Sequence, residues 1–287
     1  MSRLNKFRIS GIPLVGEFET DMSGQFSSAP STIISGRGSF VDSAILRLMY
    51  ASALPLRHDA PSEKATNEFV ARKIAGVMRL DTVGQLADRT SGSRAEVCLS
   101  GDSMEYEYSF SSRSSARVDG SRSIRGQARG NFLFLPKDNM LVNDWSLVSA
   151  LRSRRTNMDE TWADITNNLW TPPLREYGAK FQVGDVFQDL GGTTSEWTIQ
   201  RGESTFIVRD ENGRSIPSAL ISTGVSQVLE VAILVANGSL GEGDVLFWEE
   251  YDNVDLEMVS SSTLTDPAVY LSEIGVQVIC SSPRAMD

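Results

Sequence analysis

The sequence predicts an α/β protein with a mixed sheet, a largely parallel core and an inserted α/β region at about residues 81–215. Three observations lead to this prediction. From residue 32 onward, short apolar runs typical of buried strands alternate with helical patterns. The first of these runs leads through a glycine turn into a long helix. The middle of the chain is rich in period-two alternation, which indicates an inserted mixed region. We expect a single domain over residues 1–287.

The first strands and helices follow from the spacing of apolar residues. Residues 7–18 alternate roughly between apolar and polar, which predicts edge strands with a turn. Thr32–Ser35 is then a short buried strand. Val41–Leu54 has apolar residues at three- and four-residue steps, so it is a helix, and we expect Pro55 to end it.

A second helix and a β-rich section come next. Pro61–Arg79 has a helical pattern, with Ser62 as its N-cap. Glu96–Ser100 is a strand, and the strict alternation of Met104–Phe110 predicts another. Ser111–Gly130 is rich in Ser, Gly and Arg and lacks apolar periodicity, so we expect a loop.

The remaining chain returns to alternating strands and helices. Asn131–Pro136 is a buried strand that proline ends, and helical patterns run from residue 147 to 169. Glu196–Gln200 and Ser204–Arg209 are two strands joined by a short turn that contains glycine. The closing section comprises helix Ser222–Asn237, core strand Val245–Trp248, helix Thr265–Ile274 and strand Val276–Cys280.

The composition is that of an ordinary globular protein, with 40% hydrophobic and 22% charged residues. The formal net charge of −10 disfavours non-specific binding of nucleic acid by the whole molecule. No segment reaches the roughly 20 apolar residues of a membrane span. The first residues lack the apolar core of a signal peptide, so we expect a cytoplasmic protein.

Cysteine and histidine are too few for several kinds of site. Cys98 and Cys280 do not make a disulfide framework or a four-ligand zinc site, and we expect two free thiols. His58 is the only histidine, which excludes His-rich metal sites and leaves one candidate for a His-based catalytic triad. Its neighbours predict a surface loop.

Four segments carry the residues that point to a function. The first, GRGSFVDS, links the first buried strand to its helix as a phosphate-binding loop does. Such a loop needs G-x-x-x-x-G-K-[ST], in which the lysine contacts the phosphates, and the sequence has Asp42 at that position. The other three are ISTGVSQ at the start of a helix, VLFWEEYDN at a strand end and VQVICSSP at the last strand; they span residues 221–227, 245–253 and 276–283.

In this order, the four segments resemble the ABC-type P-loop ATPase heads of the SMC-like group, which includes RecF-like and OLD-like proteins of DNA repair and phage defence. The resemblance spans nearly the whole chain and is strongest toward the C-terminus. Ser222 precedes Glu250 by 28 positions and Ser281 follows it by 31. Both intervals are similar to those between the signature, the Walker B acids and the switch histidine of the group.

The resemblance implies a P-loop fold, ATP and Mg²⁺ as cofactors, and a homo- or heterodimer with another ABC-type chain. Backbone amides of a glycine loop and a helix N-terminus hold phosphates, and a hydroxyl with an acid holds Mg²⁺. The implied roles are Gly36, Arg37, Gly38, Asp42 and Ser43 for nucleotide binding, Ser222, Thr223 and Gly224 for the signature that caps a partner's nucleotide, Ser43 and Glu249 for Mg²⁺, Glu250 for catalysis and Ser281 as the switch position.

Three of the four segments depart from the pattern of the group. The first has Asp42 for the lysine and Val41 for the adjacent glycine. An acid in place of a cation disfavours phosphate binding unless a metal or a partner compensates for it. Glu249 replaces the Walker B aspartate with a longer arm, and Ser281 replaces the switch histidine. The signature and Glu250 are the best preserved.

Each segment also has a purely structural interpretation. The glycine segment is then a strand-to-helix turn, with Asp42 stabilising the helix dipole. The paired glutamates are solvent-facing acids at a strand end, and Ser222 is an ordinary N-cap. Residues 113–129 hold five arginines opposed only by Asp119, which suggests either a solvated loop or a contact with a nucleic-acid backbone. Trp162 and Trp170 are core or subunit-contact residues.

Three functions remain open from the sequence. The first is a degenerate ABC-type ATPase-like subunit, weak or inactive in its own nucleotide site, that pairs with itself or with an active ATPase in DNA repair or in phage or plasmid defence. The second is an active but atypical Mg-ATPase in which Arg37 or another residue replaces the lysine. The third is a structural or nucleic-acid-associated protein that retains only the fold.

Overall fold

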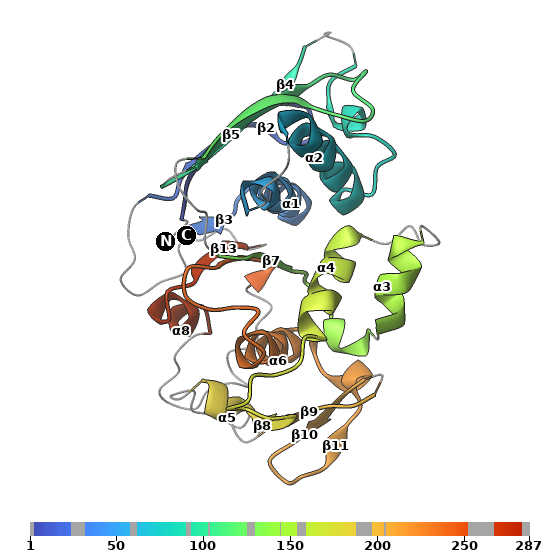
Figure 1. The fold of residues 1–287 in the computed structure, drawn as a ribbon, viewed down its shortest axis with the longest axis vertical. Coiled ribbons are helices and arrows are strands. Elements are labelled where there is room, and N and C mark those ends of the chain that lie inside the picture. The colour runs from blue at the N-terminus through green and yellow to red at the C-terminus, as the bar shows by residue number, and fades with distance from the viewer. Residues whose placement is uncertain are drawn as a thin grey trace.

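Three sheets and the helices between them build the described part of the molecule, which we take from a computed structural model (Figure 1). No helix of the described chain is long and apolar enough to cross a membrane. His58 and the predicted starts at Glu196, Ser204 and Thr265 lie outside the described residues. The structure describes residues 3–23, 32–57, 62–89, 93–102, 104–124, 130–143, 145–153, 159–187, 197–203, 205–251 and 267–282.

The central sheet is fully parallel and has four strands in the order β3-β13-β12-β7. Each strand is short and apolar, as expected for strands that are covered on both faces. The α/β class and the parallel core are therefore confirmed. The strands are β3 (Thr32–Ile34), β13 (Gln277–Ser281), β12 (Val245–Trp248) and β7 (Phe132–Leu135).

Helices α1 (Ser39–Arg57) and α6 (Thr223–Ala236) cover opposite faces of this sheet (Figure 1). The two hydrophobic cores divide the strand residues by period two, because successive side chains of a strand point to opposite faces. Phe247 of β12 belongs to the core that contains α1, whereas its neighbour Trp248 belongs to the core that contains α6. Both side chains are fully buried.

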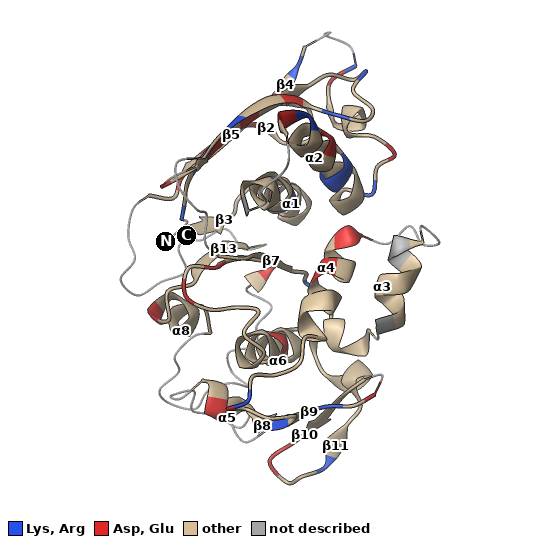
Figure 2. Ribbon diagram, in the orientation of Figure 1, with Lys and Arg blue, Asp and Glu red and all other residues tan. Residues whose placement is uncertain are grey.

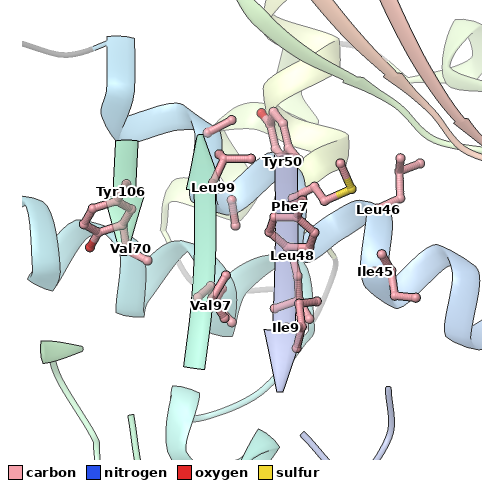
Figure 3. Packing of buried hydrophobic residues seen from close by; sticks show 14 of the residues in the cluster. Phe7, Ile9, Ile45, Leu46, Leu48, Tyr50, Val70, Val97, Leu99 and Tyr106 are labelled. Atoms are coloured by element: carbon pink, nitrogen blue, oxygen red, sulfur yellow. The ribbon is translucent and has the colours of Figure 1, made fainter. Parts of the chain in front are cut away.

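A five-stranded antiparallel sheet lies above α1 and α2 (Figure 1). Figure 3 shows the core between them: Phe7 and Ile9 from one strand and Val97 and Leu99 from the next pack near Leu48 of α1. In order, the elements are β2 (Gly16–Asp21), β1 (Leu4–Ile12), β4 (Ala95–Gly101), β5 (Met104–Phe110) and β6 (Asp119–Ile124), with α2 (Glu63–Val77) and the 3₁₀ helix η1 (Val83–Leu86).

A second antiparallel sheet, in the order β11-β10-β9-β8, lies beyond α6. Trp170 and Phe206 join it to the α6 core, with ring centroids 4.9 Å apart. Its strands are β8 (Lys180–Gln182), β9 (Thr198–Arg201), β10 (Phe206–Arg209) and β11 (Ser215–Ile216). The remaining elements are η2 (Met140–Val142), α3 (Trp145–Arg152), α4 (Glu160–Leu169), α5 (Val183–Val186), η4 (Ser218–Leu220) and α8 (Pro267–Glu273).

Residues 81–215, expected as an inserted region, contribute strands to all three sheets. Strands β4 to β6 extend the N-terminal sheet, β7 belongs to the central sheet, and β8 to β10 lie in the third sheet. Residues 81–215 are therefore not one continuous insertion outside the central sheet, because β7 returns the chain to that sheet.

Three local predictions are wrong, each for a physical reason. The loop expected at 111–130 contains β6, which pairs with β5 through backbone groups at a sheet edge and needs no apolar pattern there. Helix α1 continues through Pro55, because a proline in the last turn removes only one helical hydrogen bond. Strand β1 lies between β2 and β4, so of the two first strands only β2 is an edge.

Candidate functional site

The carboxyl ends of the four parallel strands form one edge of the central sheet. Open α/β sheets bind their ligands at such an edge. Backbone contacts bring the strand ends together: Glu249 N–H donates to Leu135 O at 2.9 Å, and Ser282 N–H donates to Ile34 O at 3.0 Å. Three of the four predicted segments therefore meet here, together with the residues that follow β7.

The glycine segment after β3 is a short turn. Gly36 and Gly38 have φ values of 91° and 94°, a region that favours glycine, and open space surrounds both. Helix α1 already begins at Ser39. Val41, at the position of the pattern's second glycine, therefore lies in the first helical turn, and the loop is shorter than a phosphate-binding loop of the expected spacing.

The guanidinium of Arg37 is engaged by the β1–β2 hairpin. Its guanidinium donates to Val15 O and Glu17 O, both at 2.9 Å, and lies 5.3 Å from the ring centroid of Phe18. These contacts attach the glycine turn to the β1–β2 hairpin. The second sequence hypothesis needs a cation at the phosphates, and Arg37 is engaged elsewhere.

Asp42 is fully buried in the first turn of α1. Neither carboxyl oxygen has a hydrogen-bond partner among the described residues. Burial raises the pKa of Asp42, while the positive charge of Arg37 opposes this rise. The neighbouring Ser43, the candidate hydroxyl ligand, is also buried.

Glu249 follows β12 and is only 1% exposed. Arg47 of α1 binds both of its carboxylate oxygens, through Nε and Nη2 at 3.0 to 3.1 Å. The backbone N–H of Lys137 also donates to Oε2, at 3.3 Å. The two oxygens of Glu249 are thus occupied by donors from the protein itself.

Glu250 has a left-handed backbone, with φ 51°, which is uncommon for a residue other than glycine. Its N–H donates to Ser281 Oγ at 3.0 Å, so the switch position contacts the candidate catalytic residue. Its Oε1 accepts from Lys137 Nζ at 2.9 Å. The Lys137 side chain is 47% exposed and that of Glu250 is 13% exposed, so this pair faces water.

The signature segment begins α6, on the other face of the sheet. Ser222 is the N-cap and accepts from Val225 N–H at 3.4 Å. Ser222 and Thr223 are exposed, whereas Gly224 is buried. Asn139, which follows β7, donates to Ser218 O and Ile221 O and so attaches this helix start to the strand end.

Gln227 connects the signature helix to the paired glutamates. Its Nε2 donates to Pro136 O at 3.0 Å and to Glu249 O at 3.2 Å. One amide group of α6 thereby binds the ends of both β7 and β12. In the sequence, Gln227 is only the residue that follows the signature.

Sequence reasoning missed four charged residues near Glu249: Arg47, Lys137, Asp138 and Asp159. The run Lys137-Asp138-Asn139 directly follows a buried strand, a signal that could have been used. Arg47 lies one turn beyond Ser43, on the same side of the helix. Asp159 carries only a local signal, as the N-cap of α4. Burial and the charge of Glu249 raise the pKa of Asp138.

The arginine segment and the tryptophans have mainly structural contacts. Arg122 donates to Pro55 O at 2.8 Å, and Arg113 and Arg117 are exposed before β6. Arg125 and Arg129 lie outside the described residues. Trp170 belongs to the α6 core and Trp162 packs against it, in agreement with the expected core role.

The described residues do not fit a nucleotide-bound Mg²⁺ in this arrangement. Mg²⁺ requires oxygen ligands in near-octahedral geometry. Both Glu249 oxygens already accept hydrogen bonds from Arg47, and Asp42 adds a buried acid where a cation is needed. No group of three or more metal-binding side chains occurs among the residues described.

No protein-family model and no curated protein matches the chain. Two solved structures are similar to nearly all of it. One is the SMC head domain from Thermotoga maritima, with a TM-score of 0.38, 10% identity and coverage of 98% of this chain and 89% of that one. The other is the recombination mediator protein RecF-ATP of the RecFOR pathway, with a TM-score of 0.41, 8% identity and coverage of 98% and 93%. Both come from the group that the sequence resembles.

Proposed function

We propose that this chain is a degenerate ABC-type ATPase-like subunit. It holds nucleotide weakly or not at all in its own site and acts by pairing with a second copy or with an active ATPase chain, in DNA repair or in phage or plasmid defence. The observation that carries the proposal is Asp42, a carboxyl group buried where the phosphate-binding pattern needs a lysine. A carboxylate at this position repels the phosphate oxygens that an ammonium would attract.

The start of α6 supports the pairing part of the proposal. A helix of 14 residues presents unpaired backbone N–H groups at its N-terminus, which favour an anion. Ser222 and Thr223 are exposed at this end. The signature is therefore free to face a nucleotide held by another chain, although the chain's own glycine turn is poorly suited to hold one.

One exposed apolar side chain lies within the glycine segment and another lies next to the signature segment. Phe40, in the first turn of α1, is 71% exposed, and Leu220, two residues before the α6 N-cap, is 77% exposed. Large exposed apolar side chains at such positions favour a protein contact. In a two-fold pair that sets the signature of one copy against the glycine turn of the other, Phe40 of one copy would pack near Leu220 of its partner.

Binding of a fluorescent ATP analogue, measured with and without Mg²⁺, tests the proposal. We expect no Mg²⁺-dependent binding by the wild-type chain. Asp42→Lys replaces repulsion by attraction, so we expect affinity for the analogue to rise at least about tenfold, or about 1.4 kcal/mol. Asp42→Asn is the matched control, because it removes the negative charge without adding a cation, and we expect a smaller gain.

Two results would contradict the proposal. One is tight Mg²⁺-dependent binding of the analogue by the wild-type chain. The other is ATP hydrolysis by the purified chain alone that Glu250→Gln abolishes. Either result would favour the active, atypical Mg-ATPase instead.

A further inference from the structure

Arg47 lies at the centre of a buried charge cluster behind the paired glutamates. Its guanidinium binds Glu249 through Nε and Nη2 and binds Asp159 through Nη1. Nη1 also donates to Val77 O at 3.0 Å, and the guanidinium carbon lies 5.5 Å from the ring centroid of Phe134. One side chain thereby joins α1 to the end of β12, the end of α2 and the start of α4.

The cluster is almost fully shielded from water. The side chain of Arg47 is 17% exposed, whereas Glu249 is 1% and Asp159 0% exposed. Buried carboxylates need a compensating cation, because removal of their hydration is costly. An arginine is always charged and offers five donors in a planar fork, so it can satisfy both carboxylates at once.

We propose that Arg47 is a built-in cation that takes the place of a divalent metal beside Glu249. The guanidinium supplies the positive charge that this carboxylate would otherwise obtain from a bound metal. It also donates hydrogen bonds to both carboxylate oxygens. This inference rests on the proposed function. It adds a cause for the inactive site that is independent of Asp42 and that concerns the metal rather than the phosphates.

The position of Arg47 makes the arrangement a structural clamp. Asp159 is the N-cap of α4, and its Oδ1 also accepts from Thr161 N–H at 2.8 Å. The clamp therefore keeps α1, β12 and α4 in one arrangement without nucleotide or metal. A subunit that only presents its signature to a partner would need such a permanently assembled site.

Replacement of Arg47 by methionine, followed by addition of Mn²⁺, tests the inference. Arg47→Met keeps the length of the apolar stem but leaves Glu249 and Asp159 without their cation. We expect a lower Tm in metal-free buffer and a rise of about 5 °C when Mn²⁺ exceeds its Kd about 100-fold. The wild-type chain should show no rise in Tm and no bound Mn²⁺ by electron paramagnetic resonance.

Lys73→Met is the matched control. Like Arg47, Lys73 is a buried cation that pairs with two carboxylates, those of Glu160 and Asp164. Its side chain is 9% exposed. Its ion pairs join α2 to α4, whose acidic start is drawn red in Figure 2, and neither pair involves Glu249 or Asp159. The two carboxylates are 41% and 31% exposed and can reach water, so we expect a lower Tm that Mn²⁺ does not restore.

Two outcomes would overturn the inference. The first is stoichiometric Mn²⁺ binding by the wild-type chain that Glu249→Gln removes. The second is a folded Arg47→Met variant whose Tm does not respond to Mn²⁺. If Arg47→Met does not fold in metal-free buffer, its refolding yield replaces the Tm. A yield raised by Mn²⁺ supports the inference, whereas a yield that Mn²⁺ leaves unchanged overturns it.

The same experiments separate this inference from the proposed function. Binding of the ATP analogue with Mg²⁺ by the wild-type chain would end the proposed function. Mn²⁺ is added without nucleotide, so a response confined to Arg47→Met would still support Arg47 as the built-in cation. Conversely, wild-type Mn²⁺ binding through Glu249 without nucleotide binding would end only the inference.

Discussion

Glu230 is a fully buried carboxyl group in the middle of α6. Its Oε1 accepts from Met140 N–H at 2.7 Å, and its Oε2 has no hydrogen-bond partner among the described residues. Burial raises its pKa well above 4.5, and the charge of Asp138 adds to this rise. The hydrogen bond from Met140 N–H opposes the shift.

The raised pKa predicts a pH-dependent loss of stability. Above 4.5 the unfolded chain releases this proton, whereas the folded chain keeps it up to a higher pH. The folded state therefore binds more protons in that window, and stability falls as pH rises through it. Glu230→Gln removes this loss.

Urea unfolding at pH 5 and pH 8 measures the effect. We expect Glu230→Gln to gain stability relative to wild type between the two pH values. Glu68→Gln, an exposed side chain on α2, should show no such gain. An identical pH dependence of wild type and Glu230→Gln would contradict the prediction.

At the scale of elements, β7 and β12 are joined at their amino ends through Gly130. This glycine has φ 128°, and a Cβ atom there would lie 2.1 Å from Gly243 O. The next residue, Asn131, accepts from Val245 N–H at 2.8 Å, which begins the pairing of the two strands. The close approach of two backbones requires a residue without a side chain.

Gly130→Ala should therefore destabilise the central sheet, by about 2 kcal/mol or more, because it combines an unfavourable φ with a backbone collision. Gly213→Ala is the control: it has φ 77° in a hairpin turn with open space around it, so we expect a loss of about 1 kcal/mol. Chemical denaturation compares them. Equal losses would show that the backbone contact is relaxed without cost.

At the scale of the whole molecule, the pairing proposal depends on the exposed residues beside the two candidate segments. Leu220→Glu places a charge where we expect an apolar contact, so the dimer should weaken at least about tenfold. Leu174→Glu is the control, since Leu174 is 44% exposed and its N–H donates to Ala236 O at 2.8 Å, at the opposite end of α6. Light scattering after size exclusion over a concentration series of the chain measures the dimer. Equal effects of both changes would argue against this interface.

The elements of the fold were largely predictable because their signals are local. Period-two alternation in β5 and three- to four-residue spacing in α1 and α6 depend only on neighbouring residues. Strand β6 was not predictable in this way, because it is held by backbone pairing with β5 and carries no apolar pattern.

In the candidate site, too, local features could be predicted and contacts between distant residues could not. The sequence alone determined the order of its four segments and the mismatch at Asp42, because both can be read from residue types at fixed intervals. Only the tertiary structure decided that Arg47 binds Glu249, 202 positions away, and Asp159, 112 positions away. It also decided that Lys137 pairs with Glu250 and that Arg37 faces the β1–β2 hairpin. The physical reason is that charge pairing depends on distance in space, which a linear pattern does not specify.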